Sequence, residues 1–262
     1  MTDSTRRRWL WPTMTTTLAL FGVGALVAAA FIPTSSTRPD DAALPIPTMM
    51  ATVPSTEAPP LTPSPSAASA TTATPIAELA DPAWVTRIAA SGSIPERALY
   101  AYAGAAIEVS KATPTCGLGW NTLAAIGLVE TEHGSMNDAT LRPDGTVTPA
   151  IVGIPLDGNG TIPVPDTDRG TIDGDTTWDR AVGPMQFIPS TWENAAQDGN
   201  RDGKKDINQI DDAALATAMH LCEVGGDLTQ PENWIDAIRA YNPSVPYNNR
   251  VAEAANHYAT LR

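Results

Sequence analysis

The sequence predicts a mainly α-helical domain that follows an N-terminal apolar segment and a disordered, proline-rich linker. After residue 76, apolar residues recur at helical spacing in several stretches, and most of these stretches begin or end with proline, glycine or a polar capping residue. We find no internal repeat and no series of alternating strands. Many of the 24 prolines lie in the N-terminal third, so the foldable part is shorter than the 262-residue chain but large enough for one hydrophobic core.

Residues 1–32 predict an export signal or a membrane anchor. Arg6, Arg7 and Arg8 precede an apolar run that ends near Ile32. Positive charge on that side keeps the arginines in the cytoplasm and sends the following chain across the membrane. The length of the run fits a cleaved signal peptide and an uncleaved anchor equally well. We therefore expect an extracytoplasmic protein that is either secreted or anchored.

Residues 33–75 consist mainly of proline, threonine, serine and alanine, as in "PSTEAPPLTPSPSAASATTATP". Such a composition cannot bury enough apolar surface to offset the entropy lost on ordering. We expect an extended linker that lets the following domain, residues 76–262, reach away from the membrane.

Three helices are expected in the first part of that domain. Ile76, Leu79, Trp84 and Ile88 can share an apolar face, "SIPERALYAYAGAAIEVSKA" repeats helical spacing, and "GWNTLAAIGLVETEHG" predicts a buried helix with Gly134 as its C-cap. Residues 134–180 are rich in glycine, aspartate, proline and threonine, with short strands expected around residues 150–154. A connection this long inside a compact domain is usually functional.

Helical patterns return after residue 188. Four stretches carry them: "PSTWENAAQDG", "DDAALATAMHLCEVGG", "PENWIDAIRAYNP" and "VPYNNRVAEAANHYATLR". Ser190 and Glu193 fit a capping box for the first of these. Trp120, Trp192 and Trp234 stand at helical spacing, which favours core packing over a sugar-binding role.

Charge and cysteine content exclude some classes of function. The formal net charge of −13 would repel nucleic acid, so no DNA or RNA partner is expected. Cys116 and Cys222 are the only cysteines, and an oxidising compartment would let them form a disulfide. A cysteine-centred active site is disfavoured because neither has a histidine nearby in the sequence. His133, His220 and His257 show no metal-ligand spacing.

The stretch "IGLVETEHG" contains two glutamates, Glu130 and Glu132, which cannot share a helix face because residues two apart point in nearly opposite directions. Glu130 lies on the stripe of Leu123, Ile126 and Gly127. A carboxyl among apolar neighbours has a raised pKa, which suits a general acid. Glu130 is therefore the better candidate, with a helix-terminal surface residue as the alternative.

Three motifs in order, "GLVETEHG", "AVGPMQFIPSTW" and "AIRAYNPS", resemble the lytic murein transglycosylases of the membrane-bound B type, in the actinobacterial branch. The resemblance covers roughly residues 81–262. It implies a lysozyme-like helical domain that binds peptidoglycan glycan strands and cleaves the β-1,4 bond between N-acetylmuramic acid and N-acetylglucosamine. It also implies that no cofactor is required.

The resemblance makes Glu130 the catalytic residue, acting first as acid and then as base, so that the products end in 1,6-anhydromuramic acid. It assigns Gln186, Tyr241 and Asn242 to substrate binding, and Thr177 by a looser alignment. Two alternatives stay open. A hydrolytic muramidase would need a second carboxylate, for which Asp173, Asp175 and Asp179 are available. A peptidoglycan-binding scaffold would not catalyse.

The stretch "DGNRDGKKDINQIDDA" predicts a possible structural calcium site. Asp198, Asn200 and Asp202 followed by Gly203 match the first half of an EF-hand loop. Gln209 stands where that loop has its bidentate glutamate. The family carries a similar loop closed later by an aspartate, which here is Asp212 or, less well, Asp211. A surface turn without an ion is the alternative.

Overall fold

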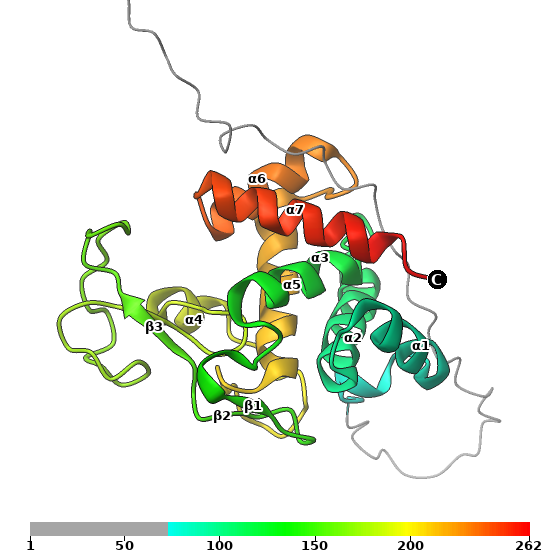
Figure 1. The fold of residues 1–262 in the computed structure, drawn as a ribbon, viewed down its shortest axis with the longest axis horizontal. Coiled ribbons are helices and arrows are strands. Elements are labelled where there is room, and N and C mark those ends of the chain that lie inside the picture. Colours follow the sequence, from blue (N-terminus) through cyan, green and yellow to red (C-terminus); the bar gives the residue numbers. More distant parts are fainter. Residues whose placement is uncertain (1–72) are drawn as a thin grey trace, which may run out of the picture. The chain divides into compact units, whose positions relative to one another are not determined.

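The computed structural model describes residues 73–262, and these residues form a mainly α-helical domain (Figure 1). The fold class predicted from the sequence is confirmed. The expected signal peptide or anchor at residues 1–32, and all but the end of the expected 33–75 linker, lie outside the described residues. Within residues 73–262, no helix combines the length and hydrophobicity that a membrane crossing requires.

The elements follow one another in this order: η2 (Ile76–Glu78), α1 (Pro82–Gly92), α2 (Glu96–Ala112), α3 (Trp120–Thr131), η3 (Met136–Asp138), β1 (Thr140–Leu141), β2 (Val147–Thr148), β3 (Val152–Pro155), β4 (Arg180–Val182), α4 (Pro189–Ala195), α5 (Ile210–Gly225), α6 (Pro231–Tyr241) and α7 (Val245–Ala259).

Proline and capping residues begin the helices. Proline stands in the first turn of α1, α4, α6 and α7, where its missing N–H leaves no hydrogen bond unmade. Asp81 caps α1 by accepting a backbone N–H at 2.7 Å. The predicted capping box of Ser190 and Glu193 is wrong. The N-cap of α4 is Ile188, so Ser190 lies inside the first turn and its side chain makes no cap.

Helix α3 is the centre of the core. It packs against α2 and α7, and Figure 1 shows α7 lying across it. Gly127 allows the close approach of α2, because a Cβ there would lie 2.0 Å from the Tyr102 hydroxyl. Trp120, Trp192 and Trp234 are all buried, which confirms their predicted place in the core. Because most residues of α3 are buried, a polar residue on this helix is also surrounded largely by protein.

The end of α3 differs from the prediction. The helix ends at Thr131, and Glu132 and His133 then adopt left-handed backbone conformations, with φ of 51° and 61°. Gly134 follows with φ of 83°, so it continues a turn that has already begun and is not the C-cap. Two successive left-handed residues reverse the chain sharply beside Glu130.

The long segment after α3 contains two small antiparallel sheets. β1 pairs with β2, and β3 pairs with β4, which confirms the short strand expected around residues 150–154. Residues 156–179 form an insertion between β3 and β4. In Figure 1 this insertion extends from the end of β3 away from the helices.

A disulfide joins Cys116 to Cys222, as expected from the cysteine count. Cys116 lies before α3 and Cys222 lies in the last part of α5. The Leu228 N–H donates to the Cys116 carbonyl at 2.7 Å, so the connection that follows α5 is held to the same place.

The loop before α5 wraps around one carboxylate. Asp212 is fully buried, and its oxygens accept backbone N–H groups from Gly199 at 2.7 Å, Asn200 at 3.2 Å and Asp206 at 2.8 Å. Gln209, at the position of the missing EF-hand glutamate, is the N-cap of α5. The loop is thus closed by hydrogen bonds around the start of a helix.

The calcium prediction fits this loop only in part. Asp198, Asn200 and Asp202 do lie on one turn, but their oxygens accept N–H groups from within that turn. Both oxygens of Asp212 are occupied by backbone donors, and Asp211 forms an ion pair with Arg97. Hydrogen bonds and an ion pair thus already engage both aspartates, and calcium remains a sequence-based prediction.

We expect the double variant Cys116→Ser, Cys222→Ser to lose about 4 kcal/mol of unfolding free energy. The reason is that the bond closes a chain separation of 106 residues in the unfolded state. Urea unfolding with and without reductant measures this. Reductant should lower the urea midpoint of the wild type and leave that of the variant unchanged. Equal midpoints for the wild type and the variant without reductant would contradict the expectation.

We expect Asp212→Asn to lower the unfolding free energy by about 2 kcal/mol, because the NH2 group of the amide would replace an oxygen that accepts a backbone N–H. Asp202→Asn, at an exposed position of the same loop, is the matched control and should change little. Thermal unfolding with and without a chelator makes the comparison. If chelator lowers the thermal midpoint of the wild type, and Asp202→Asn abolishes this decrease, an ion holds the loop instead.

Candidate active site

The last turn of α3 brings Glu130 out of the core. The residue is half-buried, and burial of its carboxyl raises its pKa from the ordinary value of 4.5 to about 7. Glu132 is exposed, in a left-handed conformation after the helix has ended. The structure thus separates the two glutamates, although by the end of the helix between them and not by helical spacing, and only Glu130 has the environment of a general acid.

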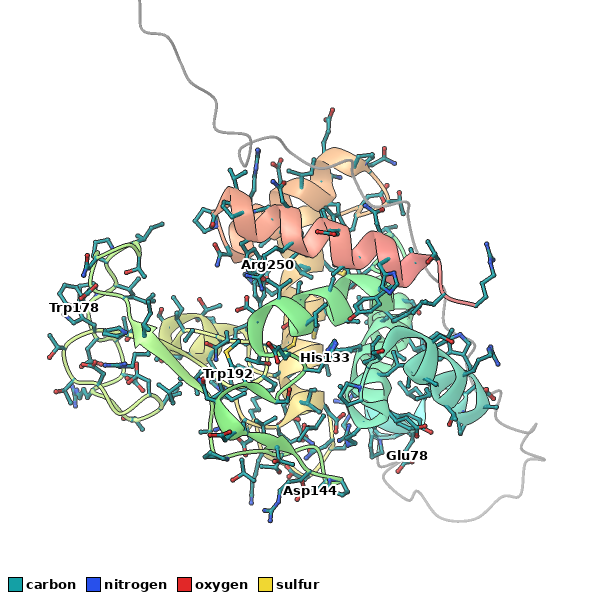
Figure 2. The ribbon with its side chains drawn as sticks, viewed as in Figure 1. Glu78, His133, Asp144, Trp178, Trp192 and Arg250 are labelled. Atoms are coloured by element: carbon teal, nitrogen blue, oxygen red, sulfur yellow. A yellow bond between two sulfur atoms is a disulfide. The ribbon has the colours of Figure 1, made fainter. Side chains whose placement is uncertain are left out.

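Two residues of α7 counteract the effect of burial on Glu130. The Tyr247 hydroxyl donates a hydrogen bond to Glu130 Oε1 at 2.7 Å, and the positive charge of Arg250 also favours the carboxylate. Arg250 is held at the end of α3 by an Nη2 hydrogen bond to the Val129 carbonyl at 3.2 Å, and Figure 2 shows it between the two helices. Burial raises the pKa of Tyr247 well above its ordinary value, so this hydroxyl remains a donor.

Sequence reasoning missed both Tyr247 and Arg250. They lie three residues apart in "VPYNNRV", the spacing of neighbours on one helix face. That pattern could have marked them as a pair, but nothing in the sequence says that α7 crosses α3 at this point.

Gln186 stands in a tight turn between β4 and α4. Val182 and Phe187 exchange backbone hydrogen bonds of 2.8 and 3.0 Å across the turn. Gln186 has a φ of 50°, and its side-chain amide donates to the Gly183 carbonyl at 2.9 Å. This conformation is uncommon for a residue other than glycine, and the side-chain bonds to the Gly183 and Ile151 carbonyls help to hold Gln186 in it.

Tyr241 connects the end of α6 to this turn. Its hydroxyl donates to the Met185 carbonyl at 2.6 Å and lies 3.3 Å from the Thr217 hydroxyl. Its ring packs edge-on against Phe187. Asn242 follows as the C-cap of α6 in an extended conformation, and its carbonyl accepts from the Asn248 side chain at 2.8 Å.

These parts enclose one cleft of about 530 Å³. Its lining comes from the end of α3, the 156–164 segment of the insertion, the turn before α4, and the 241–244 connection between α6 and α7. Of the predicted site residues, Glu130, Gln186, Tyr241 and Asn242 all lie on it. Among the residues that the structure describes, Glu130 is the only acidic side chain in the lining.

The looser prediction, Thr177, does not line the cleft. Its side chain is exposed and its N–H donates to Asp175 at 2.9 Å on the far part of the insertion. The cleft does have a threonine from the insertion, but it is Thr161. The sequence places both in loops of similar composition, so the alignment could not distinguish them.

The three aspartates considered as a second carboxylate also lie away from the cleft. Asp173 accepts the N–H groups of Asp175 and Arg180, while Asp175 forms an ion pair with the Arg180 guanidinium at 2.9 Å. Asp179 is fully buried and accepts from the N–H and hydroxyl of Thr167. Each is used to hold the insertion together.

Carboxylates gather at two other places. Asp166, Asp168 and Asp179 lie close enough to share a metal ion, yet every one of them already accepts backbone N–H groups of the insertion. The predicted calcium ligands, Asp198, Asn200, Asp202 and Asp212, lie in the loop before α5 and do not line the cleft.

The histidines are not arranged as metal ligands. His133 is buried between the hydroxyls of Tyr102 and Tyr258, each 3.2 Å from a ring nitrogen, and burial lowers its pKa to about 4. Figure 2 shows it just beyond the end of α3. His220 packs edge-on against Tyr241, and His257 is exposed. All three therefore have packing or surface roles.

A second cavity, of about 520 Å³, lies beside the disulfide. It is lined by charges of both signs, including Glu108, whose carboxylate is paired with Arg201 at 2.7 Å. Glu108 is thus held in an ion pair and Glu223, the other acid of this lining, is exposed, whereas Glu130 in the first cleft is half-buried and hydrogen-bonded to Tyr247.

Comparison with known proteins gives one match. The family model described as Transglycosylase SLT domain matches residues 166–231, which include the turn with Gln186 but neither Glu130 nor the 241–244 connection. No curated protein and no solved structure shows significant similarity to the chain. The match and the mainly helical architecture support a lysozyme-like domain of the lytic transglycosylase kind.

Proposed function

We propose that this protein is a peptidoglycan lytic transglycosylase that cleaves the bond between N-acetylmuramic acid and N-acetylglucosamine without consuming water. The observation that supports this most directly is the sole acid of the cleft, Glu130, whose burial raises its pKa to about 7. A group with that pKa can both give and take a proton near neutral pH. The resemblance of the three motifs and the partial family match point the same way.

The proposed reaction uses Glu130 twice. The protonated carboxyl first gives its proton to the glycosidic oxygen as the bond to the muramic acid C1 breaks, and the substrate's own N-acetyl group stabilises the positive charge that develops. The carboxylate then takes the proton of the C6 hydroxyl, which attacks C1 and forms the 1,6-anhydro ring. One carboxyl is sufficient because the second nucleophile comes from the sugar itself.

The other cleft residues have supporting roles in this proposal. The Tyr247 hydroxyl donates to Glu130 and keeps the carboxyl oriented. The turn of Gln186 and the neighbouring Tyr241 and Asn242 contribute polar groups to the lining of the cleft, where they would contact the sugar. No cofactor takes part in these steps.

The hydrolytic alternative is less well supported. An inverting or retaining glycosidase needs a second carboxylate within about 10 Å across the scissile bond. Asp173, Asp175 and Asp179 bond to the backbone and to Arg180 within the insertion, and none of them lines the cleft. The scaffold alternative does not explain why an acid with a raised pKa stands on the cleft lining.

We also propose an extracytoplasmic location, where the glycan strands are. The Cys116–Cys222 disulfide is stable only in an oxidising compartment, which supports export. Anchoring through residues 1–32, the reach supplied by the 33–75 linker, and the assignment to the membrane-bound B type of the actinobacterial branch belong to the same proposal.

Glu130→Gln should reduce the release of soluble muropeptides from purified peptidoglycan by about a thousandfold or more, because it removes the acid and base. Mass spectrometry should find 1,6-anhydromuramic ends from the wild type only. Glu132→Gln, two residues away and exposed, is the matched control and should keep full activity. Reducing ends from the wild type would instead indicate a hydrolase.

The same substitution should not lower stability at pH 7. The folded-state pKa of Glu130, about 7, lies above its ordinary 4.5, so the folded protein keeps a proton that the unfolded chain has lost between these values. The contribution of Glu130 to the unfolding free energy therefore decreases as pH rises from about 4.5 to 7. Gln does not titrate, so the variant does not lose stability in this way. If Glu130→Gln lost much stability at pH 7, unfolding alone could explain its loss of activity. The unfolding free energy and the activity of the variant are therefore both measured.

Tyr247→Phe should move the alkaline limb of the kcat/KM profile to higher pH. Removing the donated hydrogen bond takes away an interaction that favours the carboxylate, so the pKa of Glu130 rises further above about 7. Tyr258→Phe removes another tyrosine hydroxyl of α7, one that contacts His133 instead, and should leave the limb in place. A limb that stays fixed or moves to lower pH in Tyr247→Phe would contradict the role of Tyr247.

A further inference from the structure

The 156–164 segment of the insertion is a loop with a closed neck. The Val164 N–H donates to the Leu156 carbonyl at 2.8 Å, and both residues are hydrogen-bonded to Asp179, at 2.9 and 3.0 Å. Within the loop, Asp157 accepts the Asn159 N–H at 2.8 Å. We call residues 156–164 the cleft loop. Its ends are held by these backbone hydrogen bonds, and Gly160, Thr161 and Ile162 near its tip line the cleft.

The cleft loop presents an isoleucine to solvent. Ile162 is 65% exposed, and it lines the same cleft as Glu130. Leu156 and Val164, from the neck, line it too. Exposing a large apolar side chain has no benefit for folding, and apolar groups around a few polar ones are typical of a ligand site.

A second isoleucine of the same region shows that exposure alone is not the signal. Ile154, in β3, is 67% exposed but does not line the cleft. The two residues thus have the same side chain and nearly the same exposure. They differ in that only Ile162 lines the cleft that contains Glu130.

We propose that Ile162 is a specificity-determining residue of the cleft, which packs against the apolar face of a sugar ring and holds the glycan strand over Glu130. This rests on the proposed function. The same lining contains the polar side chains of Gln186, Tyr241 and Asn242, which offer hydrogen-bonding groups. A pyranose ring has hydroxyl and amide groups at its rim and C–H groups on its faces, so a lining with both apolar and polar groups fits it. The cleft loop therefore selects an extended sugar strand by contact and takes no part in the proton transfers.

The test compares Ile162→Ser with its matched control Ile154→Ser. In the Glu130→Gln background, each protein is sedimented with purified peptidoglycan, which measures binding without turnover. We expect Ile162→Ser to bind about tenfold more weakly, as expected for losing one buried aliphatic contact, and Ile154→Ser to bind unchanged. With Glu130 present and soluble glycan strands as substrate, Ile162→Ser should raise KM by a similar factor and leave kcat within about twofold.

A third variant removes the loop itself. Because the Val164 N–H bonds to the Leu156 carbonyl, residues 157–163 can be replaced by Asn-Gly, a dipeptide that closes a two-residue turn across such a pair. This variant should keep the thermal midpoint of the wild type and show at least the loss of binding of Ile162→Ser.

The outcomes separate the two proposals. Absence of anhydro products from the wild type would overturn the proposed function, and the sedimentation would still report on the cleft loop. An active wild type with unchanged binding and KM in Ile162→Ser would overturn the role of Ile162 alone. Equal losses in Ile162→Ser and Ile154→Ser would overturn it as well, because the effect would not be specific to the cleft.

Discussion

The partial burial of a carboxyl at the end of a helix that is otherwise almost entirely buried is the constraint on which this structure depends. Most residues of α3 are buried, so Glu130 at its end is stable only if its charged form finds partners or its proton is retained. α7 supplies both conditions. It covers the carboxyl, which raises the pKa, and it contributes the Tyr247 hydroxyl and the Arg250 charge that limit the rise. The crossing of two helices therefore sets the acidity of one group.

The remaining part of the cleft is organised by hydrogen bonds between segments far apart in the chain. The Tyr241 hydroxyl reaches the carbonyl of Met185, and so ties the end of α6 to the turn before α4. β3 and β4 hold the base of the insertion, from which the cleft loop extends. Such a cleft has a rigid floor of helix ends and a wall that depends on only a few backbone hydrogen bonds.

The sequence predicted what local patterns determine. Helical spacing predicted the helices within residues 76–134 and 189–262 and the place of Glu130 on the apolar stripe of α3. Motif resemblance predicted Gln186, Tyr241 and Asn242, which all line one cleft. It failed where tertiary contacts decide. Gly134 resembled a C-cap, but Glu132 and His133 turn the chain first; Ser190 and Glu193 resembled a capping box, but Pro189 begins the helix. Tyr247 reaches Glu130 through the crossing of α7 and α3, and Thr161 reaches the cleft through the direction of its loop; neither depends on a short sequence pattern.

The closed neck of the cleft loop has a consequence for how such a protein can change over generations. Leu156 and Val164 are adjacent in space whatever lies between them, so residues can be gained or lost in the loop without disturbing β3, β4 or the helices. The acid and its tyrosine lie on other segments and are not affected by such events. The loop and the acid can therefore change independently of each other, because they lie on different segments of the chain.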